Sequence, residues 1–232
     1  MRKVRDFSLM DLEFILEFSP MYLEAAMLTI RIALIGIVAS FITGLFCSIV
    51  KYLKIPVLVQ FINLYIELSR NTPLLIQLFF LYFGLPKIGI LLSSESCAII
   101  GLTFLGGSYM AEALRTGIDQ VTKIQTESAF SLGMKKSQVI RYIILPQAFT
   151  TSIPALCANM IFLIKETSVF SVVALADLMY VAKDLIGIYY KTDEALLMLV
   201  LSYLLLLLPI SVICSMVERR MRYAGFGNTG TV

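Results

Sequence analysis

Residues 22–50 read YLEAAMLTIRIALIGIVASFITGLFCSIV, and this stretch decides the fold class. A helix needs about 20 mostly apolar residues to cross roughly 30 Å of hydrocarbon. The stretch is longer than that and carries only two charged residues, Glu24 and Arg31. It therefore predicts a membrane-spanning helix.

The composition of the whole chain also points to a lipid environment. Of 232 residues, 59% are hydrophobic, and the mean hydropathy of +0.87 implies more apolar surface than one soluble core of this size would bury. The four cysteines lie in separate apolar stretches and histidine is absent, so we expect no metal site. The net charge of +3 comes from basic residues at the ends of apolar stretches, which fits membrane topology better than nucleic-acid binding.

Further apolar stretches follow, and we predict an all-α membrane protein of about five transmembrane helices. The expected spans cover about residues 22–50, 56–83, 96–118, 147–176 and 196–217. The second is interrupted by Glu67, Arg70, Asn71 and Pro73, and the fourth by Lys165–Ser168.

The remaining segments are more polar. Residues 1–20 are expected to form a short amphipathic helix on one membrane face, with no cleaved signal peptide. Residues 119–146 form the longest polar loop, which we place outside the bilayer. The predicted organisation is therefore an N-terminal segment 1–20, a transmembrane domain 21–222 and a tail 223–232.

The distribution of lysine and arginine predicts the orientation, because positive residues are retained on the cytoplasmic side. Ten such residues flank the spans on the side of the 119–146 loop and six flank them on the other side. We therefore expect the loop and the C-terminus in the cytoplasm and the N-terminus outside.

A polar cluster interrupts the second span. Charged groups at the membrane centre cost on the order of 3 kcal/mol each, so their presence indicates a role. Glu67 and Arg70 are spaced to meet on one helix face, while Thr72 and Pro73 loosen the helix and would free carbonyl groups to face a cavity. Glu67, Arg70, Asn71 and Thr72 are therefore candidates for a substrate pathway. The alternative is that Glu67 and Arg70 hide their charges against each other or a neighbouring helix.

A second cluster, Lys165-Glu166-Thr167-Ser168, interrupts the fourth span. Adjacent residues on a helix point to different faces, so Lys165 and Glu166 cannot share one buried stripe. At least one should reach a cavity, a backbone break or a subunit interface. All four are candidates for the substrate pathway, and a purely structural role for them stays open.

The polar loop carries the most informative pattern. It contains Glu127-Ser128-Ala129, then Gly133, and then Ile143 and Leu145-Pro146. This resembles the EAA loop of ATP-binding-cassette importers, in which Glu-Ala-Ala is followed at fixed spacing by Gly, Ile and Leu-Pro. Only Ser128 departs from it, and six matches at fixed positions are hard to obtain by chance. The small side chains of Ser128 and Ala129 beside Glu127 permit close docking to a partner, and Gly133 permits the turn that ends the helix.

Other motifs resemble the same family, specifically its polar amino-acid branch, the histidine, glutamine and arginine permeases. They are Arg70-Asn71-Thr72-Pro73-Leu74-Leu75, Gly107-Ser108-Tyr109-Met110-Ala111-Glu112, Leu145-Pro146-Gln147-Ala148 and Lys165-Glu166-Thr167-Ser168. The resemblance covers about residues 20–222. One departure is Val121-Thr122-Lys123-Ile124-Gln125, where the family usually has Val-Pro-Lys-Gly-Gln. Another is the Lys165 cluster, where the family usually has Lys-Asp-Thr-Ser.

The resemblance implies a type I importer permease fold and a chain that forms the translocation pathway for an amino acid in the bacterial inner membrane. It implies that Glu127, Ser128, Ala129 and Gly133 couple this chain to the ATPase. The expected partners are two ATPase subunits, a second permease subunit (identical or a sister chain), an extracytoplasmic solute-binding protein and membrane lipid. No GxxxxGK[ST] loop is present, so ATP and magnesium are expected in the ATPase subunits, with no cofactor on this chain.

Two other classes of function make different demands on the sequence. A channel or membrane scaffold would use the polar clusters to line a passive pore or to hold neighbours, and transport without ATP would identify it. A membrane enzyme is disfavoured, because the chain shows no GxSxG and no array of paired carboxylates or metal ligands. We therefore expect no catalytic and no metal-binding residues.

Overall fold

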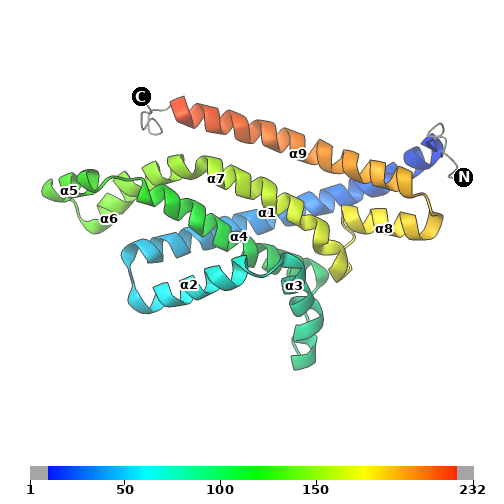
Figure 1. Cartoon of the computed structure of the whole chain (residues 1–232), viewed down its shortest axis with the longest axis horizontal. Coiled ribbons are helices and arrows are strands. Elements are labelled where there is room, and N and C mark those ends of the chain that lie inside the picture. Colours follow the sequence, from blue (N-terminus) through cyan, green and yellow to red (C-terminus); the bar gives the residue numbers. More distant parts are fainter. Residues whose placement is uncertain (1–9, 224–232) are drawn as a thin grey trace, which may run out of the picture.

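The computed structural model describes residues 10–223, all of whose regular elements are helical. Four helical segments are long and apolar enough to cross a membrane: Leu12–Leu53, Ser94–Asp119, Lys136–Val173 and Thr192–Met221. They run roughly along one long axis (Figure 1). The prediction of a helical membrane protein is confirmed.

The first span is α1 (Leu12–Leu53), a single helix of 42 residues. Asp11 caps it by accepting a hydrogen bond from the Phe14 amide at 3.0 Å. The helix continues through Pro20 without a break, so the prediction of a separate amphipathic helix ending at residue 20 is wrong for the described residues. Residues 1–9 lie outside the described part of the chain.

The expected second span is divided. Its first part is α2 (Pro56–Arg70), and 15 residues of helix extend only about 22 Å. After the break come α3 (Leu74–Phe79), η1 (Phe80–Gly84) and η2 (Leu85–Ile88), which project sideways from the long axis (Figure 1). The charged residues and proline predicted this interruption, and five spans become four uninterrupted ones plus a broken one.

The other spans follow the sequence closely. They are α4 (Ser94–Asp119), the continuous run of α6 (Lys136–Val139), η3 (Ile140–Ile144), α7 (Leu145–Glu166) and η4 (Thr167–Val173), and α9 (Thr192–Tyr223). Two short helices complete the fold. The first, α5 (Lys123–Ser131), lies in the polar loop, and the second, α8 (Leu178–Tyr189), was not predicted. The tail beyond Tyr223 lies outside the described residues.

The centre of the bundle is the contact between α1 and α4, where small residues allow the backbones to approach closely. A Cβ added to Gly44 would lie 2.5 Å from the Met110 Cβ, and the Ser48 hydroxyl donates across the contact to the Ala111 carbonyl at 3.0 Å. Lipid offers no hydrophobic drive for helices to associate, so close packing and hydrogen bonds of this kind hold spans together. This contact therefore fixes the position of α4 relative to α1.

Candidate substrate site and docking loop

The site starts at the break between α2 and α3. Pro73 has φ −60° and ψ 143° and precedes α3, as expected for a residue that cannot continue the preceding helix's hydrogen bonds. The Asn71 side-chain amide donates to the Glu67 carbonyl at 2.8 Å, and the Thr72 hydroxyl donates to the Leu68 carbonyl at 2.6 Å. Gln77 donates to the Ser69 and Thr72 carbonyls. Side-chain groups of the protein thus donate hydrogen bonds to all four of these carbonyl oxygens. The expectation that freed carbonyls face the cavity is therefore wrong here.

Arg70 turns away from Glu67. Its guanidinium lies over the Tyr109 ring, 5.2 Å from the ring centroid, which is within the range of a cation–π contact. Within residues 10–223, neither Arg70 nor Glu67 takes part in an ion pair. The ion pair between Glu67 and Arg70 that the sequence suggested is therefore not formed. Arg70 contacts the ring of Tyr109 on α4 instead.

A cavity of about 320 Å³ lies beside the break. Two ionisable side chains of opposite charge line it, Arg70 from α2 and Glu166 from the end of α7, and Asn71 and Thr72 add polar groups. The other lining residues are Pro73, Leu74, Leu75, Leu105, Tyr109, Phe162 and Val169. Apolar walls with a few converging polar groups are typical of small-molecule sites.

The structure separates the four residues of the second cluster. Lys165 and Ser168 line a different cavity of about 610 Å³ between α7 and α9. Thr167 is fully buried, and its hydroxyl donates to the Ile164 carbonyl at 2.7 Å and lies 3.4 Å from the Tyr203 hydroxyl. Only Glu166 reaches the cavity that Arg70 lines. The expectation that the two adjacent charges diverge is confirmed, whereas grouping all four residues at one site is not supported.

Two aromatic residues of the Arg70–Glu166 cavity were missed as site candidates. The rings of Tyr109 and Phe162 lie 5.1 Å apart, and the Asn159 side chain ties α7 to the Tyr109 carbonyl at 3.1 Å. Tyr109 belongs to the Gly107–Glu112 motif, and Phe162 precedes Glu166 by one helical turn, which puts both α7 side chains on one face. These signals could have identified both residues.

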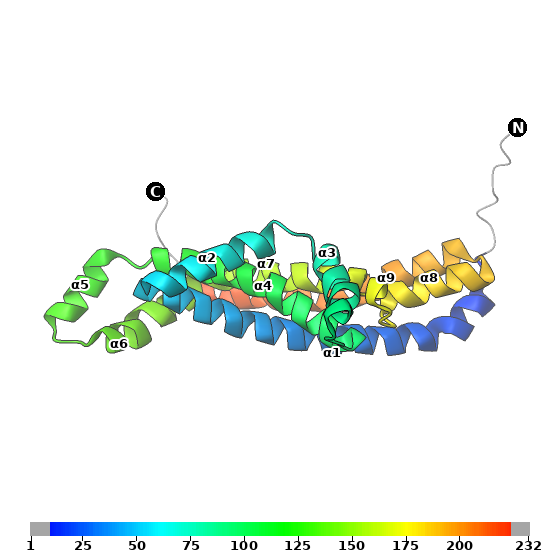
Figure 2. The same ribbon diagram turned by 90° about the horizontal axis from the view of Figure 1, so that it is seen from below.

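The polar loop forms a projection at one end of the molecule. Figure 2 shows α5 and α6 extending beyond the neighbouring spans, at the end where α1 and α9 also finish. Gly133 has φ +79°, a left-handed conformation that favours glycine at the end of a helix. Glu127 and Ser128 are exposed on α5, together with the apolar side chains of Ile124, Phe130 and Leu132.

Ala129 has a role that differs from the expectation. Its side chain is only 2% exposed and lies in a small cluster with Val139 and Ile144. The chain turns back at Gly133, where the Met134 amide donates to the Ala129 carbonyl at 3.1 Å. Ala129 therefore packs inside the loop, and its side chain is not part of the exposed surface of α5.

A bundle of spans along one axis, a broken helix beside a cavity with charged groups, and a projecting polar loop that exposes apolar side chains are the features expected of the membrane-embedded permease subunit of a transporter. Residues 36–223 match the family described as "Binding-protein-dependent transport system inner membrane component". The chain belongs to this family of permease components. It forms a translocation pathway, and the ATPase is a separate component.

Several known proteins are similar to the chain. A probable amino-acid ABC transporter permease protein, PatM of Vibrio harveyi, is 37% identical over 196 residues, which are 83% of this chain and 88% of the relative. The probable glutamine permease GlnP of Bacillus subtilis is 37% identical over 71% of this chain and 75% of its own. The crystal structure of an amino acid ABC transporter with histidines superposes with a TM-score of 0.84 at 30% identity, over 91% of this chain and 99% of that one.

Proposed function

We propose that this chain carries an amino acid across the bacterial inner membrane and that the Arg70–Glu166 cavity receives it. The observation that carries the proposal is the pair of opposite charges on one cavity, Arg70 and Glu166. A zwitterion presents a carboxylate and an ammonium group. Arg70 suits the carboxylate, because a guanidinium donates two parallel hydrogen bonds to it, and Glu166 suits the ammonium.

The apolar walls of the cavity support this assignment. Charge pairing is stronger where water is scarce, and Tyr109 and Phe162 cover the space beside Arg70 and Glu166. The similarity to amino-acid permeases, among them an arginine permease, ArtQ of Bacillus subtilis, gives independent support.

The partners follow from the same proposal. One of two ATPase subunits docks on the exposed face of α5 around Glu127 and Ser128. A second permease subunit, identical or a sister chain, docks the other ATPase and completes the pathway. A solute-binding protein delivers the cargo on the opposite side. Closure of the ATPase dimer on ATP moves the docked loops as rigid bodies and switches the access of the cavity.

The proposed orientation has the N-terminus outside and the C-terminus in the cytoplasm. The start of α1 and the end of α9 lie at opposite ends of the long axis, and the end of α9 lies with α5 and α6 (Figure 1). The basic residues of this end include Lys51, Lys123 and Arg219, which favours a cytoplasmic location.

The test is uptake of radiolabelled arginine, glutamine and histidine by proteoliposomes that hold the full complex with its ATPase and binding protein. We expect ATP-dependent accumulation of at least one of them, and loss of that accumulation in Glu166→Gln. Uptake that persists without ATP would identify a passive channel. ATP-dependent uptake of none of a full amino-acid set would overturn the assignment of the cargo.

A further inference from the structure

One face of α2 carries a stripe of polar side chains that leads away from the cavity. Gln60, Asn63, Glu67 and Arg70 follow one another at intervals of three, four and three residues, and this spacing places them on one side of a helix. All four are exposed. From Arg70 the stripe runs back along α2 to Gln60. The start of α2 lies toward the end of the molecule where α5 and α6 project (Figure 1).

A second exposed face of α2, beside the polar stripe and not opposite it, is apolar. Phe61, Leu64 and Leu68 are 66%, 53% and 53% exposed and recur at helical spacing. A helix in contact with lipid alone would be apolar on every exposed side. The division of α2 into an apolar and a polar exposed face therefore shows that the polar face meets something other than hydrocarbon.

A second polar stripe lies on the neighbouring helix α4. Tyr109, Glu112 and Thr116 are spaced at three and four residues and continue the line of Leu105, which lines the cavity. Glu112 pairs with Arg115 at 2.5 Å. The α4 stripe therefore also runs from the cavity toward the end of the molecule that carries α5.

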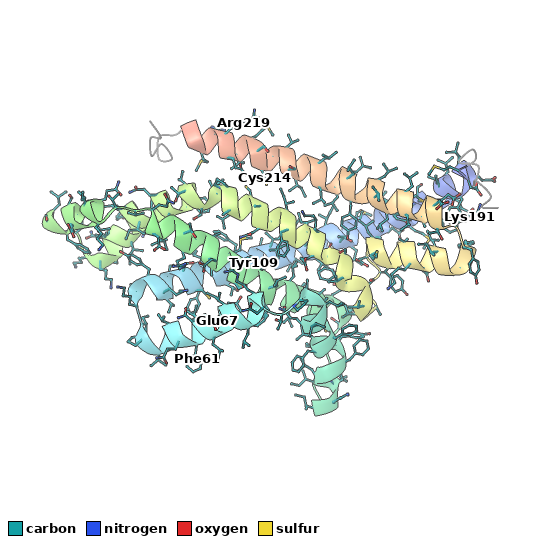
Figure 3. All side chains as sticks on the ribbon, in the orientation of Figure 1. Phe61, Glu67, Tyr109, Lys191, Cys214 and Arg219 are labelled. Atoms are coloured by element: carbon teal, nitrogen blue, oxygen red, sulfur yellow. The ribbon has the colours of Figure 1, made fainter. Side chains whose placement is uncertain are left out.

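The two stripes run side by side. The Tyr65 and Ser69 hydroxyls of α2 both donate to the Phe104 carbonyl of α4, at 2.7 and 2.8 Å, and Arg70 stacks on Tyr109. The helices are antiparallel neighbours in both views (Figures 1 and 2). The α2 residues that precede Arg70 in the sequence therefore lie beside the α4 residues that follow Tyr109. Figure 3 labels Glu67 and Tyr109 on these adjoining helices, and Phe61 on α2.

We propose that these stripes, together called the polar strip (Gln60, Asn63, Glu67 and Arg70 of α2 with Tyr109, Glu112 and Thr116 of α4), form a wall of the cytoplasmic half of the translocation pathway. Within the strip, Glu67 is the subsite that receives the positive group of the cargo after it leaves the Arg70–Glu166 cavity. The inference rests on the proposed function, because it requires an import pathway through this chain.

Charge distribution selects Glu67 for this role. The Glu112 carboxylate is occupied by Arg115, which also reaches Asp119 at 3.3 Å. Glu67 has no ion pair within residues 10–223 and does not line the Arg70–Glu166 cavity. A carboxylate at this depth is costly without a positive partner, and a passing ammonium group supplies one.

The first test is the accessibility of introduced cysteines in inside-out membrane vesicles that hold the full complex. The probe is MTSET, a cationic methanethiosulfonate that does not cross membranes. The cysteine thiolate, after losing its proton to water, attacks the probe sulfur to form a mixed disulfide and releases methanesulfinate. All four native cysteines are buried, so the wild-type chain supplies the background rate.

We expect Gln60→Cys and Asn63→Cys to react at least tenfold faster than the matched variants Phe61→Cys and Leu68→Cys on the apolar face of the same helix. Trapping the complex with ATP and vanadate should slow the reaction of the first two. Equal rates on the two faces of α2, or faster labelling of the apolar face, would overturn the assignment of the polar strip to the pathway.

The second test measures the charge of Glu67. In the Asn63→Cys background, the rate ratio of cationic MTSET to anionic MTSES should fall about fivefold in Glu67→Gln, as expected for one charge about one helical turn away. Glu67→Asp should keep the ratio, and Glu218→Gln controls for a carboxylate outside the strip. An unchanged ratio in Glu67→Gln, or an equal fall in Glu218→Gln, would reject the subsite. Both readouts are taken without cargo, so they can fail independently of the uptake assay.

Discussion

The guanidinium of Arg70 lies 5.2 Å from the centre of the Tyr109 ring, and this contact joins the end of α2 to the middle of α4. It holds Arg70 at the cavity without neutralising its charge, because an aromatic ring is not an anion. An ion pair with Glu67 would have cancelled the charge instead. The contact therefore leaves Arg70 free to bind the carboxylate of a cargo.

The first prediction concerns the ring of Tyr109. Tyr109→Phe keeps the ring face under Arg70, and we expect ATP-dependent uptake close to that of the wild type. Tyr109→Leu removes the ring, and since cation–π contacts contribute about 0.5–2 kcal/mol, the half-saturating cargo concentration of binding to the purified complex should rise about fivefold. Equal binding by the two variants would show that the ring does not position Arg70.

The second prediction compares the two adjacent charges of α7. Glu166 lines the Arg70–Glu166 cavity and Lys165 lines the cavity against α9, so Lys165→Gln is a matched control for Glu166→Gln. A lost charge-assisted hydrogen bond costs about 1.5–3 kcal/mol, and we expect Glu166→Gln to weaken cargo binding by more than tenfold. Lys165→Gln should change it less than threefold. The reverse order would move the substrate site to the α9 side.

Hydropathy and local chemistry predicted much of this structure. The spans could be located because lipid demands about 20 apolar residues per crossing, and the break at Glu67–Pro73 could be located because charges and proline are costly inside such a helix. Divergence of Lys165 and Glu166 followed from helix geometry alone. These are all properties of residues close together in the sequence.

The remaining features depend on contacts between distant parts of the chain. Tyr109 meets Arg70 only because α2 packs against α4. Ala129 is buried only because Val139 and Ile144 fold back over it. The carbonyls released by the break could have faced the cavity, but Gln77, five residues after Thr72, reaches back to two of them. Local periodicity carries no information about such pairings.

The third prediction concerns stability at the contact of α1 and α4. A Cβ at Gly44 would lie 2.5 Å from the Met110 Cβ and 2.7 Å from the Ala111 backbone nitrogen, and backbone cannot move aside cheaply. Overpacking of this kind costs about 1–3 kcal/mol, so Gly44→Ala should lower the Tm of the detergent-solubilised complex. Gly187→Ala on α8, where a Cβ meets no atom within 4 Å, should leave the Tm unchanged or raise it slightly, because alanine favours the helix. Equal Tm values for both variants would contradict the close packing.

The fourth prediction concerns pH at the start of α1. The Phe14 amide and the Lys191 ammonium, which lies 2.9 Å from the Asp11 carboxylate, lower the pKa of Asp11 below its usual value. A carboxyl group with a lowered folded-state pKa stabilises the fold above its unfolded pKa, and this contribution is lost as the pH falls through the folded value. The Tm difference between wild type and Asp11→Asn should therefore shrink between about pH 6 and about pH 3. A constant difference would show that the pair does not contribute.

The last prediction concerns Gly133 and the docking loop. Its φ of +79° costs an L-residue with a Cβ about 1–2 kcal/mol, more if the side chain is β-branched, whereas asparagine adopts this conformation more readily. A Cβ at this position would meet no atom within 4 Å, so the cost comes from the backbone and not from a clash. Gly133→Val should therefore distort the turn that returns the chain over Ala129, while the spans insert normally.

The expected order of loss in ATP-dependent uptake is Gly133→Val, then Gly133→Ala, with Gly133→Asn closest to wild type. Because the defect lies in the coupling of two subunits, ATP hydrolysis should continue while its stimulation by cargo-loaded binding protein falls. Ala129→Leu should act in the same way by expanding the cluster with Val139 and Ile144. Normal uptake by Gly133→Val at normal expression would mean that the loop geometry does not transmit the motion of the ATPase.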